Sequence, residues 1–321
     1  MVVTCRAFPE TLALLRAHGE VIANDTEAPW SAARLRDACR DAEAMLAFMP
    51  DRVDAGFLEA CPRLRIVACA LKGYDNFDVK ACAARGVWLT IVPDLLTDPT
   101  AELTLGLMIG LGRQLLAADA TMRRGDFAGW RPVLYGHSID GATVGLIGGG
   151  AVGRAIARRL GGFDCSTLVH DLSPGATLPP NARWATLDET VATADWLIAA
   201  LPLTAGTRHL IDAALLARMK PGARLVNPGR GSVVDERAVG DALQSGRLGG
   251  YAADVYELED WALDDRPRSV DPRLLADTGR TLFTPHIGSA VESVRRAIEL
   301  DAANNIVEAL RGDRPHGAIG R

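Results

Sequence analysis

Three charged groups follow successive apolar runs in the second half of the sequence, a pattern that could support proton transfer beside a bound anion. They are Arg230, an acidic segment at residues 254–259, and His286. A histidine titrates in the range that proton transfer near neutral pH requires, and a carboxylate bonded to it fixes its tautomer and raises its basicity. An arginine offers an anion a planar fork with permanent charge.

Taken singly, each group has an ordinary alternative: a surface arginine, a solvated acid, or a histidine satisfied within the fold. The apolar runs before them have the pattern of strands, however, and in a doubly wound parallel sheet ligands bind beyond the carboxyl ends of the strands. Three such groups at three successive strand ends are therefore expected to converge on one crevice.

A glycine-rich loop indicates which ligand that crevice accepts. Residues 148–153 read GGGAVG and fit the pattern GxGxxG, between an expected strand and an expected helix. Gly148 permits a tight turn, Gly150 lets the backbone approach a pyrophosphate, and Gly153 lets the helix and strand pack closely. The free N–H groups and the positive dipole end of the helix favour phosphate there. The loop predicts a bound dinucleotide.

An acidic residue, Asp171, ends the next expected strand, 18 positions after Gly153. A carboxylate there accepts hydrogen bonds from the ribose hydroxyls and repels the additional 2′-phosphate of NADP. No arginine follows before Arg183, which also favours NAD as the cofactor. The ordinary alternative for Asp171 is a solvated loop acid.

The elements around these residues alternate in the manner of βαβ units. Two long helical patterns, at residues 99–124 and 291–311, have no strand of their own and would cross between domains. We expect an α/β protein of two doubly wound parallel-sheet domains with a ligand cleft between them. Residues 1–97 plus 291–321 form a flavodoxin-like substrate domain, and residues 98–290 a Rossmann NAD domain. The expected strands are 2–4, 20–22, 44–48, 65–68 and 87–90 in the first domain, and 143–147, 167–170, 196–200, 224–227, 250–253 and 281–284 in the second.

Composition argues against several classes of function. The chain has 321 residues, 48% of them hydrophobic, and a formal net charge of −5, which argues against a surface that coats nucleic acid. Its six cysteines form no CxxC pair and no metal-ligand spacing, so free thiols in a reducing cytoplasm and no metal site are expected. The longest apolar stretch, residues 103–112, is too short to cross a membrane, and a buried helix is expected there.

Several strings resemble the D-2-hydroxyacid dehydrogenases, and the resemblance extends over nearly the whole chain. They are RGSVVDERAVGDAL from Arg230, YAADVYELE ending at Glu259, and TPHIGS around His286. The resemblance implies NAD-dependent hydride transfer, a homodimer, and a catalytic trio of Arg230, Glu259 and His286. Glu259, not Glu257, matches the family's acid, five residues beyond Asp254, which resembles the residue that meets the nicotinamide amide. The other cofactor contacts that the resemblance implies are Thr100, Ala151, Val152, Ala200, Leu201, Pro202, Pro228, Gly229, Arg230, His286 and Ser289.

A narrower resemblance is to the phosphite dehydrogenases within this family. It rests on long shared strings such as ACALKGYDNFDV, ELEDWALDDRPR and LFTPHIGSAVESVR. Lys72, followed by Gly73, stands where other members usually carry a small or apolar residue. The resemblance implies that Lys72, Arg230 and Arg295 bind phosphite, a small anion that needs several convergent cations. Water would attack phosphorus while hydride passes to the nicotinamide. The further residues that line or border such a site are Gly73, Met49, Trp130, Tyr135 and Ser289.

Alternatives remain open on the substrate side. Lys72 has the ordinary alternative of a surface lysine, and Met49 and Trp130 that of plain core residues. The substrate could instead be glyoxylate, hydroxypyruvate or another 2-oxoacid. An alternative of a different class is an NAD-sensing binding protein of the same fold, similar to the transcriptional corepressors that keep the trio. Either His286 or Arg230 could accept the proton.

Overall fold

The computed structural model describes residues 1–175 and 177–320, and its internal contacts divide the chain into two units. Unit 1 consists of Met1–Leu96, Trp261–Asp264 and the segment from Ser289 onward, and unit 2 of Thr97–Asp260 and Asp265–Gly288. The sequence assigned residues 261–264 to the second domain. The structure groups them with unit 1, where Arg52 Nη1 donates to Asp264 Oδ1 at 2.8 Å.

Unit 1 is built on a six-stranded sheet of order β13-β5-β4-β3-β1-β2. Five strands are parallel, in the order of flavodoxin-like folds, and β13 adds an antiparallel edge. All residues of β3 and β4 are buried, as expected of strands covered on both faces. The strands are β1 (Val2–Val3), β2 (Ile22–Ala23), β3 (Ala44–Ala47), β4 (Ile66–Cys69), β5 (Trp88–Thr90) and β13 (Ala318–Gly320).

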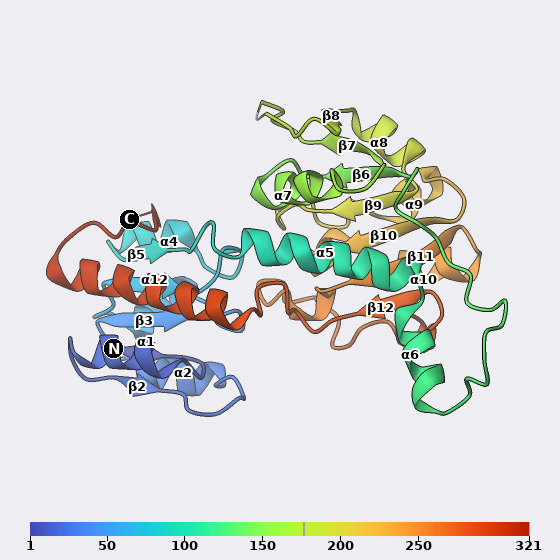
Figure 1. The fold of residues 1–321 in the computed structure, drawn as a ribbon. Coiled ribbons are helices and arrows are strands. Elements are labelled where there is room, and N and C mark those ends of the chain that lie inside the picture. The colour runs from blue at the N-terminus through green and yellow to red at the C-terminus, as the bar shows by residue number, and fades with distance from the viewer. Residues whose placement is uncertain (176, 321) are drawn as a thin grey trace. The chain divides into compact units, whose positions relative to one another are not determined.

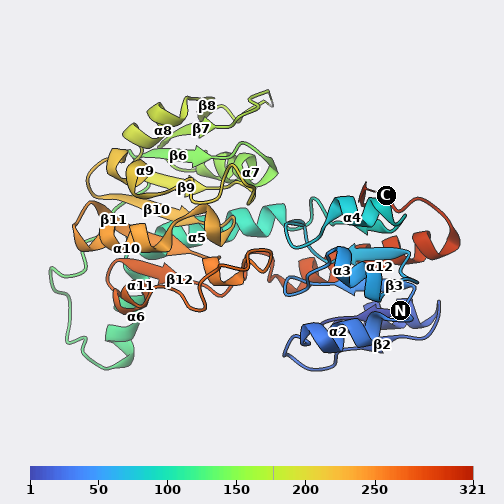
Figure 2. The same cartoon turned by 180° about the vertical axis from the view of Figure 1, so that it is seen from behind.

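Helices cover both faces of this sheet. Residues of α1 (Pro9–Arg16) and α12 (Glu292–Arg311) pack with the strands in one apolar cluster. The opposite face packs against α2 (Ala32–Cys39), α3 (Ala55–Ala60) and α4 (Val79–Ala84). Figure 1 shows α12 in front of the sheet. In Figure 2, which views the protein from the opposite side, α2 and α3 lie in front of the sheet. Ser31 caps α2, its hydroxyl accepting a hydrogen bond from Arg34 N.

Unit 2 is built on a seven-stranded parallel sheet of order β12-β11-β10-β9-β6-β7-β8. The order from β8 to β11 is that of the Rossmann fold, 3-2-1-4-5-6, and β12 extends it by one strand. The strands are β6 (Thr143–Ile147), β7 (Ser166–His170), β8 (Ala182–Trp184), β9 (Trp196–Ala199), β10 (Ala223–Asn227), β11 (Leu248–Ala253) and β12 (Thr281–Phe283).

The two faces of the unit 2 sheet carry different helices. One face packs against α5 (Thr97–Gly112) and α7 (Ala151–Leu160), which lie in front of the sheet in Figure 1. The other packs against α8 (Leu187–Thr193), α9 (Ala213–Arg218), α10 (Glu236–Gln244) and α11 (Pro272–Ala276). Two short 3-10 turns, η1 (Gly231–Val233) and η2 (Glu257–Glu259), follow β10 and β11.

The expected fold class, two parallel-sheet α/β domains, is confirmed, but three local expectations differ. The edge strands β8 and β13 were not predicted. The single helix expected at residues 99–124 is two helices, because Gln114 adopts a left-handed backbone (φ 51°) between α5 and α6 (Leu115–Arg123). The returning chain occupies the end of α5, where His137 N donates to the carbonyl of Gly112 at 2.8 Å. Of the helices in the described part of the chain, none is both long and apolar enough to cross a bilayer.

Candidate active site

The residues singled out in the second half of the sequence lie along one edge of the unit 2 sheet. Parallel strands place their carboxyl ends at a common edge, and each of these residues follows such an end directly or by a short turn. In sheet order they are His286 after β12, Asp254 after β11, Pro228, Gly229 and Arg230 after β10, Ala200, Leu201 and Pro202 after β9, the glycine loop after β6, and Asp171 after β7.

The glycine loop has the geometry that a dinucleotide turn requires. Gly148 has a φ of 110°, and a Cβ there would lie 2.2 Å from the carbonyl oxygen of Ala200. A Cβ on Gly153 would lie 2.0 Å from the carbonyl oxygen of Gly148, so strand and helix approach to backbone contact. A Cβ on Gly150, by contrast, would meet no atom within 4 Å. Open space before the start of α7, where Ala151 and Val152 begin the helix, fits a pyrophosphate.

Asp171 lies beside this loop and is bound to it. Its Oδ2 accepts a hydrogen bond from Gly149 N at 2.7 Å, and its Oδ1 accepts one from Ser173 N at 2.9 Å. These backbone hydrogen bonds, first from Ser173 and then from Gly149, lower the pKa of the Asp171 carboxyl below its usual value. The residue is therefore a fixed anion beside the glycine loop, and its contact with a ribose stays a prediction.

At the other end of the edge, His286 pairs with Glu259. The distance from His286 Nδ1 to Glu259 Oε2 is 2.7 Å, and the side chains are 29% and 18% exposed. Glu259 Oε1 accepts a hydrogen bond from Tyr256 N at 2.8 Å, so both oxygens of the carboxylate are bound. His286 has a left-handed backbone (φ 53°), which an ordinary side chain adopts only when its surroundings impose it.

Asp254 is the residue that imposes the conformation of this loop. Its Oδ1 accepts hydrogen bonds from Thr284 Oγ1 (2.6 Å) and Ile287 N (2.8 Å), and its Oδ2 accepts one from Gly288 N (2.7 Å). Burial raises the pKa of the Asp254 carboxyl, which is 1% exposed. Thr100, at the start of α5, lies next to Gly288. The observed role of Asp254 is thus to hold the His286 loop, and its contact with a nicotinamide stays a prediction.

Arg230 is positioned by the turn that follows β10. Asn227 Nδ2 donates to the carbonyl of Arg230 at 2.9 Å, and Asn227 Oδ1 accepts from Gly229 N at 3.1 Å. The guanidinium, in a half-buried residue, donates to the carbonyl of Gly229 at 3.1 Å. A Cβ on Gly229 would lie 2.8 Å from the carbonyl oxygen of Ala199, so the turns after β9 and β10 pack closely.

The candidate substrate residues of unit 1 also gather at strand ends. Met49 follows β3, and Lys72 and Gly73 follow the neighbouring strand β4. Asn76 Nδ2 donates to the carbonyl of Met49 at 2.8 Å and so joins the two loops. From the first turns of α12, Arg295 Nη1 donates to the carbonyl of Ala70, two residues before Lys72, at 3.3 Å. Ser289 opens the segment that leads into this helix.

Trp130 and Tyr135 are strongly exposed, and Tyr135 lies at the opposite edge of the unit 2 sheet from His286. Trp130 is 83% exposed and Tyr135 is 75% exposed. Tyr135 borders a hollow of about 220 Å³ with Arg224, at the amino ends of the unit 2 strands, whereas His286 lies at their carboxyl ends. The reason is the contact of the returning chain with Gly112, where Gln114 Nε2 also donates to the carbonyl of Tyr135 at 3.0 Å.

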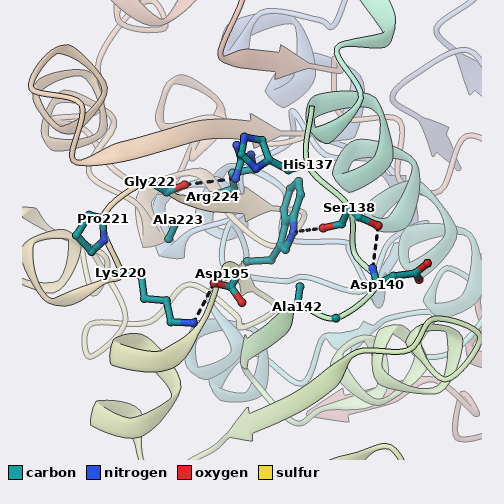
Figure 3. Close-up of a pocket in the computed structure, with 12 residues that line it drawn as sticks. His137, Ser138, Asp140, Ala142, Asp195, Lys220, Pro221, Gly222, Ala223 and Arg224 are labelled. Atoms are coloured by element: carbon teal, nitrogen blue, oxygen red, sulfur yellow. Dashed lines mark hydrogen bonds and ion pairs between the residues drawn. The ribbon is translucent and has the colours of Figure 1, made fainter. Parts of the chain in front are cut away.

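A larger hollow of about 400 Å³ lies at the same amino-terminal edge. Figure 3 shows its charged lining, in which Lys220 pairs with Asp195 at 2.9 Å and Arg224 donates to the carbonyl of Gly222 at 3.3 Å. The residues that line it lie just before β6, β9 and β10 or at the first positions of β9 and β10. This hollow is therefore at the opposite edge of the sheet from the glycine loop and His286.

Sequence reasoning missed a second histidine–carboxylate pair beside the first. His209 Nε2 lies 2.8 Å from Glu257 Oε2, and Glu257 is in the same turn, η2, as Glu259. The chain gives no local signal for this pair, because His209 and Glu257 are 48 positions apart and His209 lies in none of the motifs identified in the sequence.

Comparison with known proteins identifies the family. Residues 105–288, more than half of the chain, match the model of the D-isomer specific 2-hydroxyacid dehydrogenase NAD binding domain. The chain is 34% identical to a glyoxylate reductase of Thermococcus onnurineus, over 100% of this chain and 96% of that protein.

Solved structures extend the similarity to the whole fold. The TT0316 protein of Thermus thermophilus aligns with a TM-score of 0.89 and 31% identity over 99% of both chains. An NADPH-dependent glyoxylate/hydroxypyruvate reductase of Sinorhizobium meliloti, solved with NADP and malonate, aligns with a TM-score of 0.85 and 30% identity over 99% of this chain and 95% of that one. Together with the glycine loop, the Rossmann strand order and the groups at the strand ends, these matches place the chain in the D-isomer specific 2-hydroxyacid dehydrogenase family of NAD(P)-dependent oxidoreductases.

Proposed function

We propose that the chain oxidises phosphite to phosphate, with NAD⁺ as hydride acceptor and His286 as the base. The observation that carries the catalytic part is the 2.7 Å contact between His286 and Glu259, at the sheet edge that also carries Arg230 and the glycine loop. A histidine held by a carboxylate beside a permanent cation is suited to proton removal from a reactant bound as an anion.

The chemistry assigns each residue a step. A bound nicotinamide supplies the position that accepts hydride. Since the carboxylate of Glu259 can only accept a hydrogen bond, Nδ1 of His286 carries the hydrogen and Nε2 is free to take a proton. A water molecule forms a new P–O bond, the P–H bond breaks with its electron pair leaving as hydride, and a proton of the water goes to Nε2. Arg230 binds the oxyanion throughout.

Phosphite as the substrate rests on the strings shared with the phosphite dehydrogenases and on the cations of unit 1. Lys72 stands in the loop after β4, and Arg295 is tied to that loop through the carbonyl of Ala70. A small oxyanion offers few contacts, so each additional cation that binds it contributes a large share of its affinity.

A second candidate is reduction of glyoxylate, hydroxypyruvate or a related 2-oxoacid. The names of the compared relatives support it more directly than they support phosphite, because they are glyoxylate and glyoxylate/hydroxypyruvate reductases. The same residues would then catalyse hydride transfer in the opposite direction, from NADH to the 2-oxoacid. Arg230 would bind the carboxylate, and His286, protonated, would donate its proton to the carbonyl oxygen as hydride arrives at carbon.

Absorbance of NADH at saturating cofactor separates the candidates. Phosphite with NAD⁺ should give a steady rise, and the His286→Ala variant serves as the matched control for contaminating activity. Glyoxylate or hydroxypyruvate with NADH should give a slower fall. A kcat/KM for either 2-oxoacid above that for phosphite would assign the second function. No turnover with any of them, nor with D-lactate or glycerate, together with tight NAD binding, would favour an NAD-sensing protein.

A further inference from the structure

The turn η2 carries two glutamates, and each is bonded to a different histidine. Glu259 pairs with His286 at 2.7 Å, and Glu257 pairs with His209 at 2.8 Å. Both histidines have left-handed backbones, with φ of 53° and 49°. Only Gln114 and Leu134 share that conformation among the other non-glycine residues that the structure describes. Side chains rarely adopt it unless the surrounding structure requires it.

His209 also bonds the turn that follows Arg230. Its backbone N donates to the carbonyl of Ser232, in η1, at 2.7 Å. The two turns are tied to each other as well, since Ser232 N donates to Asp260 Oδ2 at 2.6 Å. A Cβ on Gly231 would lie 1.9 Å from the carbonyl carbon of Tyr256, so the backbones of η1 and η2 are in direct contact. His209 therefore connects the turn after Arg230 with the turn that contains Glu259.

The partner of His209 is fixed on its other side by α10. Glu257 Oε1 accepts a hydrogen bond from Glu236 N, and Glu257 N donates to Glu236 Oε1, both at 2.9 Å. Glu236 is 3% exposed, and burial raises the pKa of its carboxyl to about 7. With Glu236 bonded on one side, the imidazole of His209 supplies the hydrogen-bond partner for the other oxygen of Glu257. The other titratable groups around the pair include Tyr251, Tyr256, Asp260, Asp271 and the ion pair of Arg208 with Asp265.

We propose that His209 is a positioning residue for the reaction: through Glu257 it fixes η2 so that Glu259 holds His286, and through Ser232 it fixes the turn beside Arg230. This inference rests on the proposed roles of Arg230, Glu259 and His286. The two bonds of His209 described above go to Glu257 and Ser232, not to Arg230, Glu259 or His286. Its contribution is the alignment of two groups, and displacement of such groups by about 1 Å lowers turnover by roughly 10- to 100-fold.

The test compares His209→Ala and His209→Gln in the full-length protein, with whichever substrate the wild-type protein turns over. His209→Ala should lower kcat roughly 10- to 100-fold and leave the Kd for NADH, measured by fluorescence, within about twofold. The limb of kcat/KM that His286 sets should move to lower pH, because a loosely held Glu259 stabilises the protonated imidazole of His286 less; this is the acid limb for oxidation of phosphite and the alkaline limb for reduction of a 2-oxoacid. His209→Gln keeps a donor for Glu257 and should recover most of kcat and the original limb.

A matched control is available in unit 1, where His316 pairs with Asp301 and Glu308 at 3.1 and 3.0 Å. His316→Ala removes a similar histidine–carboxylate contact far along the chain from η1 and η2, and should leave the pH profile in place. A His209→Ala profile that keeps its shape and position, with rates normalised to folded protein, would show that His209 is merely structural and overturn the proposal. If His209→Ala does not fold, Glu257→Gln provides the same comparison, since it keeps the acceptor for Glu236 N and alters only the contact with His209.

Failure of the proposed function gives a different result. If His286→Ala keeps its turnover, the assigned base is wrong, and the positioning role of His209 is overturned with it. If His286→Ala is inactive while both His209 variants behave as wild type, only the positioning role is overturned.

Discussion

The Nδ1 atom of His286 lies 2.7 Å from Oε2 of Glu259, and the second oxygen of the same carboxylate accepts the backbone N–H of Tyr256 at 2.8 Å. The carboxylate is therefore held by its own turn as well as by the imidazole. A fixed acceptor at Nδ1 selects the tautomer in which Nε2 is the proton acceptor. The position of the His286 imidazole thus depends on the conformation of η2 as much as on the histidine loop.

Replacement of His286 by alanine should abolish most turnover and spare cofactor binding. Loss of a general base typically lowers kcat by about 10²–10⁴-fold. The Kd for NADH should stay near the wild-type value, because the glycine loop at residues 148–153 follows β6, four strands away from β12 in the sheet. Steady-state kinetics and fluorescence titration measure the two quantities. Glu259→Gln keeps a hydrogen-bond acceptor for Nδ1 of His286, so its kcat should fall less than that of His286→Ala. A His286→Ala enzyme with a tenth of the original kcat would indicate another base.

Removal of the charge at Asp171 should relax a preference for NAD over NADP. The carboxylate repels a 2′-phosphate, and its low pKa keeps it ionised at neutral pH. Asp171→Asn is the more informative variant, because its amide oxygen can still accept from Gly149 N, whereas Asp171→Ala also releases the loop. We expect the ratio of kcat/KM for NADP to that for NAD to rise about 10- to 100-fold in Asp171→Asn. Equal efficiency with both cofactors in the unaltered protein would contradict the assignment.

Much of this site follows from local pattern. The glycine loop, Asp171 and His286 could be located because strand ends and the GxGxxG turn have short-range signatures, and the strand order then brings them to one edge. Likewise, Ser31 could be identified as a helix cap from its type and position.

Other features depend on contacts between distant segments and leave no such trace. The break at Gln114 arises because the chain returns to Gly112 from residue 137, and the same contact takes Tyr135 to the amino ends of the strands. The His209–Glu257 pair joins residues 48 positions apart. The antiparallel strand β13 forms through pairing with β5, which lies more than 200 residues earlier. Pattern reasoning over short windows does not reach such separations.

The buried carboxyl of Asp51 in unit 1 should make stability depend on pH in the acid range. Asp51 is 7% exposed and accepts hydrogen bonds from Thr4 Oγ1 and Phe48 N, yet burial raises its pKa from 3.8 to about 6. As pH rises from about 4 to 6, the unfolded chain releases this proton before the folded one does. Ionisation of this carboxyl therefore lowers the free energy of unfolding. The penalty is absent at low pH and complete above pH 6, where it reaches about 3 kcal/mol for two pKa units.

Asp51→Asn keeps an acceptor oxygen but cannot ionise. The melting temperature of this variant minus that of the wild-type protein should increase from pH 4 to pH 7, as measured by circular dichroism in matched buffers. A difference that stays constant over this range would mean that Asp51 titrates alike in the folded and unfolded chain.

Lys72 distinguishes the phosphite proposal from the 2-oxoacid alternative. If it is a substrate cation, Lys72→Ala should raise KM for phosphite about 10- to 150-fold, since a buried charge-assisted contact contributes roughly 1.5–3 kcal/mol. Lys72→Arg should recover part of the loss, because the charge survives while its reach and geometry change. Lys80→Ala provides a matched control, an exposed lysine on α4 of the same unit. Cofactor affinity should change little in all three variants, since the glycine loop belongs to unit 2. Unchanged phosphite kinetics in Lys72→Ala would remove the main residue that supports phosphite and make a 2-oxoacid the better assignment.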